Sequence, residues 1–238
     1  MRGRMPMRPL EEIADAAVAV FLERGFRPAG ISDVAAALGL SHGAVYTYAK
    51  SKQALFHLAL TRVLQPGAVG GMAVPVPSPS AGEIIALVES WAGDRSGLAL
   101  LTEAASGPSE SSGRLSAAAE VEALVDELYT FVERNRVALQ LVERCAEELP
   151  ELAQWYFVQW RRSTIELIGA FLATRIEAGL LRPVPDVPVA ARFIVETVAW
   201  FAMHRHGDPD SRMLADDDCR RTVRHLLVAA FPTTGGES

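Results

Sequence analysis

The sequence predicts an all-α protein with a small N-terminal helical unit followed by a larger helical bundle. Apolar residues recur at helical spacing along nearly the whole chain of 238 residues, and no alternating apolar–polar run is long enough for a sheet. Glycines and prolines interrupt this pattern at intervals that suit helices of ordinary length. Half of the residues are apolar, so a chain of this length can bury a substantial core.

Four short helices are expected in the first 64 residues. The apolar stripe over 10–24 predicts the first, which Gly25 ends, and the pattern then predicts helices over 31–38 and 42–48. Ser51 is expected to cap a fourth helix that ends at about Leu64, before a proline. Residues 66–82 contain four prolines and four glycines, so we expect a linker or mobile loop over 65–82.

The rest of the chain is expected to form longer helices. The predicted segments are helices over 83–105, 117–148, 150–179, 189–205 and 215–231, with a loop over 106–113. Pro150 is expected to open the third of these helices and Gly179 to end it.

We expect two domains, 1–52 and 53–238, in a cytoplasmic protein. No run of about 18 uncharged apolar residues is present, which argues against a membrane span. The basic N-terminus leads into Glu11 and Glu12, unlike a signal peptide. Cys145 and Cys219 are far apart in helical patterns, as expected for thiols in a reducing compartment.

The charge is unevenly distributed. The chain carries a net charge of −6, but residues 1–64 hold eight Lys and Arg against five Asp and Glu. The remainder holds fifteen basic and twenty-four acidic residues. A cationic head on an acidic body suits a phosphate-binding module joined to a different module.

Residues 31–52 have the spacing of a helix-turn-helix. Gly39 lies at the turn, where a positive φ is needed, and Ser41 can cap the second helix. Ala35 is small where the second helix must approach the first closely. Apolar residues that would hold the two helices at a fixed angle are Val34, Leu38, Leu40 and Val45. An αα-hairpin packed only for structural reasons is the alternative.

The same region resembles the TetR family of bacterial transcriptional repressors over residues 10–60. The matching residues are Ala17, Phe21, Gly25, Phe26, Asp33, Val34, Ala35, Gly39, Leu40, Ser41, Gly43, Ala44, Val45, Tyr46, Lys50, Ser51, Lys52, Leu55 and Phe56. Two positions depart from the family pattern. Gly30 stands where a capping threonine or serine is common, and Ala49 where an aromatic residue is common; both departures are expected to weaken DNA binding.

The resemblance implies a recognition helix that enters the major groove of double-stranded DNA. Carried over residue by residue, the DNA-binding set is Ser32, His42, Gly43, Ala44, Tyr46, Thr47, Tyr48 and Lys52. Of these, Ser32, Tyr48 and Lys52 are expected to hold phosphates, and the others to face base edges. Direct base readout by this set is sparse, so DNA shape is expected to contribute to specificity.

The resemblance also implies that the C-terminal half binds a small apolar or amphipathic effector and forms a homodimer. Residues expected to line the effector site are Trp91, Phe131, Trp155, Tyr156, Gln159 and Trp160. Residues expected at the dimer interface are Ile194, Val198, Phe201, Val223, Leu226 and Leu227. Such a dimer would read a palindromic operator, and the effector would release it by changing the separation of the recognition helices.

No enzymatic activity, cofactor or metal is expected. The chain has no glycine-rich phosphate loop and no Gly-x-Ser-x-Gly motif. His204, His206 and Asp208 invite a metal site, but their spacing across a helix end favours a structural role. The alternatives are a helical effector-binding protein with weak or lost DNA binding and, less favoured, an all-α enzyme.

Overall fold

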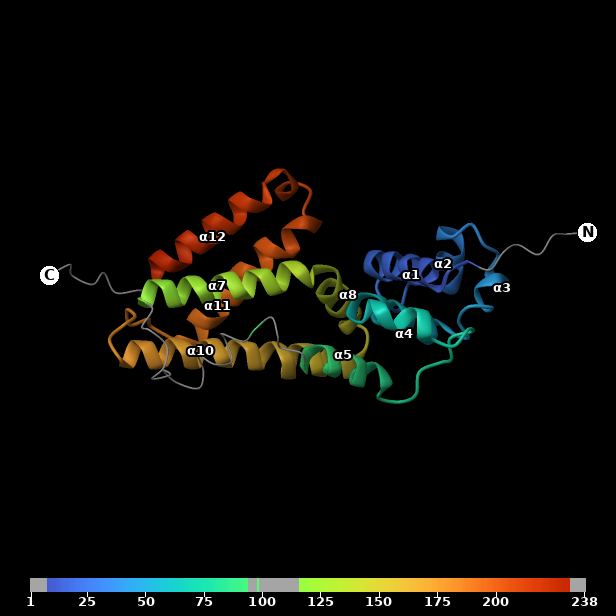
Figure 1. Ribbon diagram of the computed structural model, residues 1–238, viewed down its shortest axis with the longest axis horizontal. Coiled ribbons are helices and arrows are strands. Elements are labelled where there is room, and N and C mark those ends of the chain that lie inside the picture. The colour runs from blue at the N-terminus through green and yellow to red at the C-terminus, as the bar shows by residue number, and fades with distance from the viewer. Residues whose placement is uncertain (1–7, 94–97, 99–115, 232–238) are drawn as a thin grey trace, which may run out of the picture. The chain divides into compact units, whose positions relative to one another are not determined.

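The computed structural model describes residues 8–93, 98 and 116–231, and every named element in this part of the chain is helical (Figure 1). The predicted all-α class is therefore confirmed. The chain divides into two compact units, Met1–Gly93 with Val137–Val158, and Asp94–Arg136 with Gln159–Ser238.

The first unit is built on the packing of α1 (Leu10–Arg24) against α4 (Lys52–Leu64). Their contact buries an aromatic cluster in which the ring centroid of Phe21 lies 5.2 Å from that of Phe56 and 6.0 Å from that of Phe26. In the sequence, α2 (Ile31–Ala37) and α3 (His42–Val45) come between α1 and α4. The unit also contains α5 (Glu83–Gly93), most of α8 (Arg136–Ala146) and α9 (Pro150–Ala153).

The end of α1 shows why glycine is required at residue 25. Gly25 has φ +83° and ψ −179°, a conformation that residues with a side chain rarely adopt. A Cβ atom there would also lie 3.2 Å from a carboxylate oxygen of Glu148. The same carboxylate accepts a hydrogen bond from the backbone N–H of Arg27. The loop between α1 and α2 is thus held by a residue more than a hundred positions away in the sequence.

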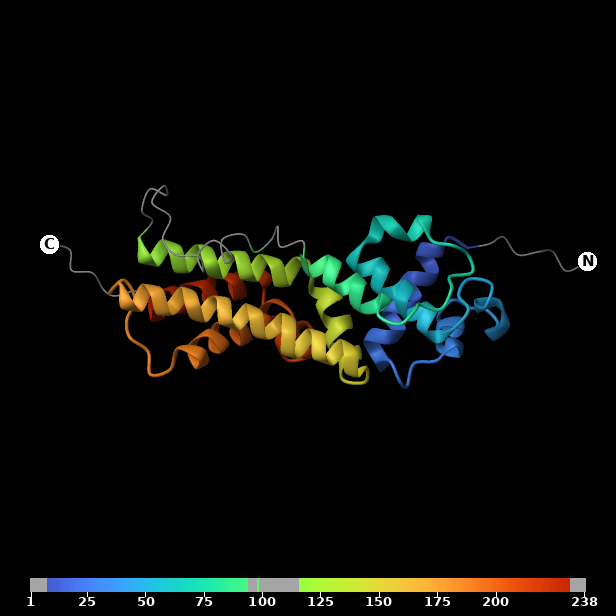
Figure 2. The ribbon, with the colours of Figure 1, turned by 90° about the horizontal axis from the view of Figure 1, so that it is seen from below.

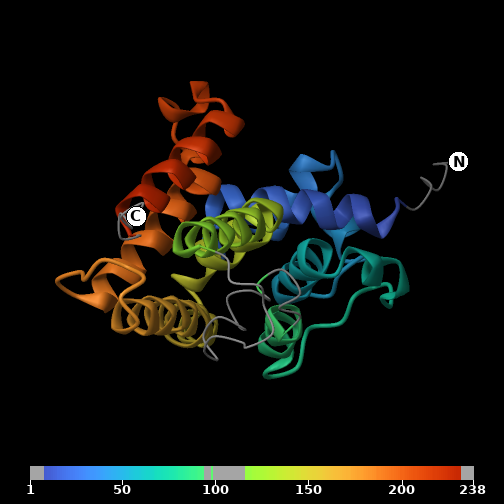
Figure 3. The same ribbon diagram turned by 60° about the vertical axis from the view of Figure 1, so that its left-hand side comes forward.

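The second unit is a bundle of α7 (Ala117–Arg134), α10 (Arg161–Glu177), α11 (Val187–Ala202) and α12 (Asp216–Ala230). The axes of α7 and α10 are nearly parallel, and the two helices run in opposite directions (Figure 2). Helix α11 packs against α7, α10 and α12, so it is central to the bundle (Figure 3). Its buried stripe is Ala191, Ile194, Val195, Val198 and Ala202.

Ion pairs join the helices of this bundle. Arg175 of α10, only 7% exposed, donates to Glu120 of α7 at 3.0 Å and lies over the Phe171 ring. Arg220 of α12 donates to Glu133 of α7 at 2.8 Å. A buried arginine needs such a partner, because an unpaired charge in the core would be strongly destabilising.

Several expected helices have different bounds in the structure. The predicted helix over 117–148 is broken at Asn135, which leaves helical geometry with φ −100° and ψ 13°. Its side-chain Nδ2 donates to the carbonyl oxygen of Phe131 at 2.8 Å, an asparagine interaction that competes with continued helix. The expected helix over 42–48 is shorter, since α3 ends at Val45 and Tyr46–Tyr48 form a turn.

The C-terminal part follows the predicted order with local changes. The segment from Pro150 to Gly179 is helical and Gly179 has φ +70°, but it contains a π-helix over Gln154–Trp160. Helix α11 ends at Ala202 and is followed by short 3₁₀ turns, His204–Gly207 and Ser211–Met213. Helix α5 is described to Gly93; the remainder of the expected helix over 83–105 and the loop over 106–113 lie outside the described residues, except Leu98.

We predict that Gly25→Ala destabilises the protein more than Gly39→Ala. Both residues have positive φ, +83° and +63°, so both substitutions strain the backbone by about 1–3 kcal/mol. Only at Gly25 does the new Cβ also meet a side chain, whereas nothing lies within 4 Å of the Cβ position at Gly39. Urea unfolding of the two variants measures the difference; equal losses would contradict the proposed role of Glu148.

We also predict that His57→Leu flattens the pH dependence of stability. Burial lowers the pKa of His57 from its ordinary value of 6.5, with partial opposition from Glu83, and Nδ1 is buried without a hydrogen-bond partner. The unfolded chain therefore binds a proton more readily, and the free energy of unfolding falls as the pH drops below about 6.5.

Unfolding in urea at pH 7.5 and 5.5 checks this prediction. We expect the leucine variant to gain about 1 kcal/mol at pH 7.5, because an unsatisfied buried polar atom is removed. The loss on acidification should be smaller than in the parent protein. Some loss remains, because burial also lowers the pKa of His206. An unchanged or larger loss on acidification would contradict the prediction.

Candidate nucleic-acid interface

The helix-turn-helix is formed by α2, a turn at Gly39, and α3. Gly39 has φ +63°, as the turn requires. The seam between the helices is apolar, with Val34 and Val45 almost fully buried and Leu38 7% exposed. Ser41 caps α3, its side chain accepting a hydrogen bond from the N–H of Ala44 at 3.3 Å.

Asp33 stabilises the start of α2, because Gly30 has no side chain that could cap the helix. Its Oδ2 accepts a hydrogen bond from the N–H of Gly30 at 2.7 Å, and its Oδ1 accepts one from Arg24 at 2.8 Å. A Cβ atom at Gly30 would lie 3.2 Å from Ser32 Oγ and 3.3 Å from Asp33 Oδ2. The start of α2 is therefore stabilised without a hydroxyl side chain at residue 30.

The expected base-facing residues lie on the surface of α3 and the turn after it. His42, Gly43, Tyr46 and Thr47 are exposed, and Ala44 is half-buried. The exposed fraction of Tyr46 is 44%, so its ring is not part of the core. The rings of His42 and Tyr46 are 5.5 Å apart in an edge-to-face arrangement.

The hydroxyl of Thr47 is already used as a donor. Its Oγ1 donates to the carbonyl oxygen of Ala44 at 2.7 Å. The lone pairs of this oxygen and the side-chain methyl group stay available. Thr47 can therefore accept from a base amino group or meet a thymine methyl group without losing its internal hydrogen bond.

Lys52 lies at the start of α4, next to its capping residue Ser51. Its Nζ donates to the carbonyl oxygen of Arg27 at 2.8 Å and lies 4.7 Å from the centroid of the Phe26 ring. An ammonium group has three donors, so this contact leaves others for a phosphate oxygen. Ser32 is also an expected phosphate ligand, and it is exposed at the start of α2.

Tyr48 differs from the expectation. It is only 5% exposed, and its hydroxyl oxygen accepts a hydrogen bond from the N–H of Arg8 at 2.8 Å. The side chain is therefore part of the core and anchors the main chain at Arg8, just before α1. The tyrosine is apolar over most of its surface, which suits burial with only the hydroxyl satisfied.

Sequence reasoning missed the residues that hold the loop between α1 and α2. Besides the contact of Glu148 with Arg27, Arg144 of α8 donates to the carbonyl oxygen of Arg24 at 3.2 Å. These contacts link positions about 120 residues apart. No local pattern near Arg144 or Glu148 indicates them.

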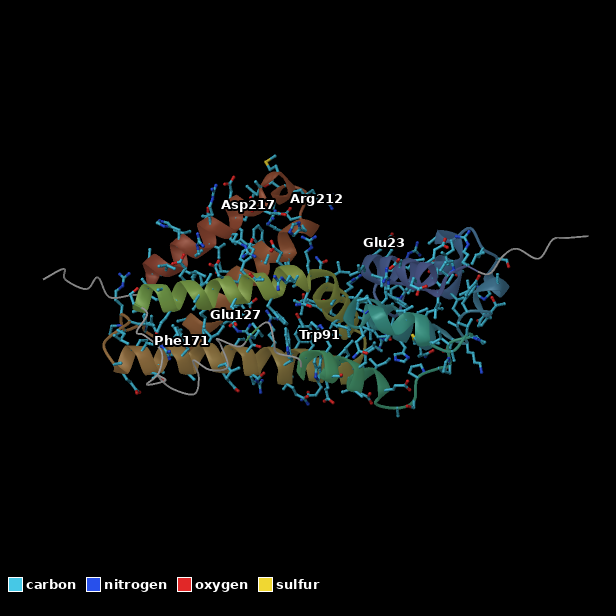
Figure 4. The ribbon with its side chains drawn as sticks, viewed as in Figure 1. Glu23, Trp91, Glu127, Phe171, Arg212 and Asp217 are labelled. Carbon is cyan, nitrogen blue, oxygen red and sulfur yellow. The ribbon has the colours of Figure 1, made fainter. Side chains whose placement is uncertain are left out.

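The residues expected to line an effector site are divided between the two units. Trp91 lies on α5 (Figure 4) and, like Trp155 and Tyr156, belongs to the first unit. Trp155 and Tyr156 are buried. In the second unit the Phe131 and Trp160 ring centroids are 6.1 Å apart, and Gln159 is exposed. The π-helix Gln154–Trp160 carries four of the six residues, and such segments are frequent at functional sites.

Most residues expected at a dimer interface lie in the core of the second unit. Ile194, Val198, Val223 and Leu227 are at most 2% exposed, so they pack within their own chain, and Phe201 is half-buried. Only Leu226, at 61%, is well exposed. Large exposed apolar side chains of α11 instead lie on another face of that helix: Val189, Phe193 and Trp200.

The segment Val187–Gly207 is long and apolar enough to cross a bilayer, judged by length and composition among the described residues. This is weak evidence for a membrane helix, because core helices of water-soluble proteins pass the same test. The segment includes α11, one face of which packs in the second unit.

The histidines after α11 have structural partners. His206 Nε2 lies 2.7 Å from Arg136 Nη1, and burial together with this guanidinium lowers the pKa of the imidazole. The Asp208 carboxylate accepts from Ser211 Oγ at 2.6 Å. His204 lies in the same turn. Among the described residues, no group of three or more His, Cys, Asp or Glu is placed to hold a metal ion.

Residues 13–59 match the family model of bacterial regulatory proteins of the tetR family. The match covers α2, α3 and most of α1 and α4, and so includes the complete helix-turn-helix. No curated protein matches the sequence.

Solved structures with the same fold include several transcriptional regulators. The ketosteroid regulator KstR2 of Mycobacterium tuberculosis is 16% identical, with a TM-score of 0.56, covering 97% of this chain and 98% of that chain. A tetR-family protein from Rhodococcus RHA1 is 19% identical, with a TM-score of 0.51 and coverage of 94% and 96%. FadR from Bacillus subtilis, in complex with stearoyl-CoA, is 16% identical, with a TM-score of 0.50 and coverage of 92% and 97%.

Proposed function

We infer that residues 13–59, which match the tetR-family model, form a DNA-binding domain in a chain that has the fold of TetR-family transcriptional regulators. From this premise we propose that the protein is a cytoplasmic repressor that binds a palindromic operator as a homodimer and is released by a small apolar or amphipathic effector. The observation that carries the proposal is the exposed outer face of a capped α3 within the matched domain.

In this proposal the contacts with DNA divide into two classes. His42, Ala44, Tyr46 and Thr47 face base edges, and Gly43 permits close approach. Ser32 and Lys52 hold phosphates, and they set the orientation of the domain without reading sequence. Tyr48 has a supporting role, because its hydroxyl bonds to the backbone of Arg8.

The proposed effector is apolar because of the residues available to bind it. The expected set contains three tryptophans, a tyrosine and a phenylalanine, which favour apolar or amphipathic ligands. The stearoyl-CoA bound by Bacillus subtilis FadR is a ligand of that protein. At 16% identity this likeness concerns the fold, so the effector class is inferred from the aromatic residues alone.

The proposed dimer interface uses the exposed apolar side chains of α11 and α12. Phe193, Val189 and Leu226 are 58%, 67% and 61% exposed, and large apolar groups at such exposure are typical of interfaces. Arg192 and Glu196 lie on the same helix and form an ion pair at 3.1 Å. This pair favours a protein partner over a bilayer, since charges are costly in hydrocarbon.

We predict that Lys52→Ala and Thr47→Ala weaken DNA binding in different ways. Loss of Lys52 should reduce affinity for all duplexes by a similar factor and lower the salt slope by about one. Loss of Thr47 should cost about 1–3 kcal/mol at one base position and relax the preference there. Fluorescence anisotropy with duplexes selected by the purified protein, at several salt concentrations, measures both.

Arg221→Ala serves as the matched control, because it also removes one positive charge, from an exposed side chain of α12. This variant should leave the affinity, its salt slope and the base preference unchanged. If wild-type protein selects no duplex, the alternative of an effector-binding protein with lost DNA binding is favoured. Selection by the wild type with no effect of either variant would contradict the residue assignment.

We predict that Phe193→Asp converts the dimer to a monomer without unfolding it. A buried aromatic at the centre of an interface commonly contributes 2 kcal/mol or more, so the dimer dissociation constant should rise at least about thirtyfold. Sedimentation equilibrium measures the change, and circular dichroism checks the fold. Met213→Asp, at an 83% exposed residue, is the control. A dimeric Phe193→Asp variant would place the interface elsewhere.

A further inference from the structure

The proline-rich segment after α4 returns to the chain that follows α3. The N–H of Val76 donates to the carbonyl oxygen of Tyr48 at 2.7 Å, and the N–H of Lys50 donates to the carbonyl oxygen of Val76 at 3.0 Å. These bonds form an isolated parallel bridge between Val76 and Ala49. Residues 72–80 are called the strap below. The expectation of a linker or mobile loop did not include these contacts.

The sequence of the strap allows backbone pairing at a single residue, Val76. Pro75 and Pro77 flank Val76 and have no N–H, so Val76 is the single backbone donor among the three. A residue before proline is restricted to extended conformations, which the bridge requires of Val76. Little conformational entropy is then lost when the bridge forms, and the prolines prevent a longer ladder.

The strap also accounts for the small residue at position 49. Ala49 and Val76 are both fully buried. A larger side chain at residue 49 would have to displace the packed groups around this buried position. Val76 supplies apolar contact beside the recognition segment that an alanine alone would not provide.

Hydroxyl groups tie the strap to the two helices that flank it. Ser78 Oγ lies 2.7 Å from Ser51 Oγ, which caps α4 by accepting from the N–H of Ala54 at 3.1 Å. Towards α5, the N–H and Oγ of Ser80 donate to Glu83 Oε2 at 2.8 and 2.9 Å. The strap is thus bonded to the end of the recognition segment, to the start of α4 and to the start of α5.

We propose that the strap is a positioning element for DNA recognition, with Val76 as its central positioning residue. It holds Tyr48–Lys50 in the orientation at which the preceding α3 presents its side chains, and it makes that orientation depend on α5. Helix α3 has only four residues, so it has little rigidity of its own, and it precedes the strap's contact point by one turn of chain. This inference rests on the proposed function.

The test uses the full-length protein and the duplex that the wild type selects. Val76→Pro removes the N–H that donates to Tyr48. We expect its affinity for the selected duplex to fall about tenfold, the upper range for one lost hydrogen bond. Affinity for an unrelated duplex and its salt dependence should stay unchanged. Val74→Ala, at a 40% exposed strap residue outside the bridge, is the control and should bind as the wild type does.

A second variant decides the matter if Val76→Pro does not fold. Pro77→Ala keeps the Val76 side chain and both bridge bonds but frees the backbone of Val76, so a smaller loss of specific affinity is expected with only a slight fall in melting temperature. Specific affinity equal to that of the wild type would overturn the proposal. The proposal would also be overturned if specific and non-specific affinity fell by the same factor together with a marked fall in melting temperature, because that pattern indicates a purely structural role.

Amide hydrogen exchange separates failure of this inference from failure of the proposed function. The amides of Val76 and Lys50 should be protected in wild-type protein without DNA, as their hydrogen bonds require. A wild type that selects no duplex contradicts the proposed function. Unprotected amides at Val76 and Lys50 contradict the strap even when specific DNA binding is observed.

Discussion

The DNA-facing geometry of this protein depends on the burial of Val45 against α2. Helix α3 has only four residues, and a helix of this length is unstable in isolation because nucleation is costly. Val45 is fully buried against a seam that includes Val34 and Leu38, and this packing fixes the angle between the two helices. The exposed residues on the other side of α3 are oriented only because this apolar contact is present.

Around this contact the first unit supplies a second set of supports, which act on main-chain groups. The carbonyl oxygen of Arg27 accepts a hydrogen bond from Lys52, and the N–H of Arg27 donates to the carboxylate of Glu148. Tyr48 bonds to Arg8 on one side, and its carbonyl oxygen receives the N–H of Val76. Each support bonds to a backbone N–H or C=O group, so each restricts the main chain around the recognition segment.

The second unit depends on the buried apolar face of α11 and on ion pairs between its helices. Helix α11 buries one apolar stripe against three neighbouring helices and leaves Phe193 and Val189 exposed on another face. Charged side chains of α7, α10 and α12 form pairs between helices, as Arg175 does with Glu120. The bundle is thus complete within one chain while keeping apolar surface for a partner, which is what the proposed homodimer requires.

The sequence by itself determined features that depend on a few neighbouring residues: the all-α class, the bounds of α1 and α4, the glycine turn at Gly39 and the serine caps. These follow from rules that operate within one or two helical turns. Only the tertiary structure decided that Tyr48 is buried, that Ile194 and Val198 face the core, and that Val76 pairs beside Ala49. Helix α11 has more than one apolar face, and local spacing cannot say which face packs inside. That choice depends on contacts between residues distant in sequence, which no local pattern encodes.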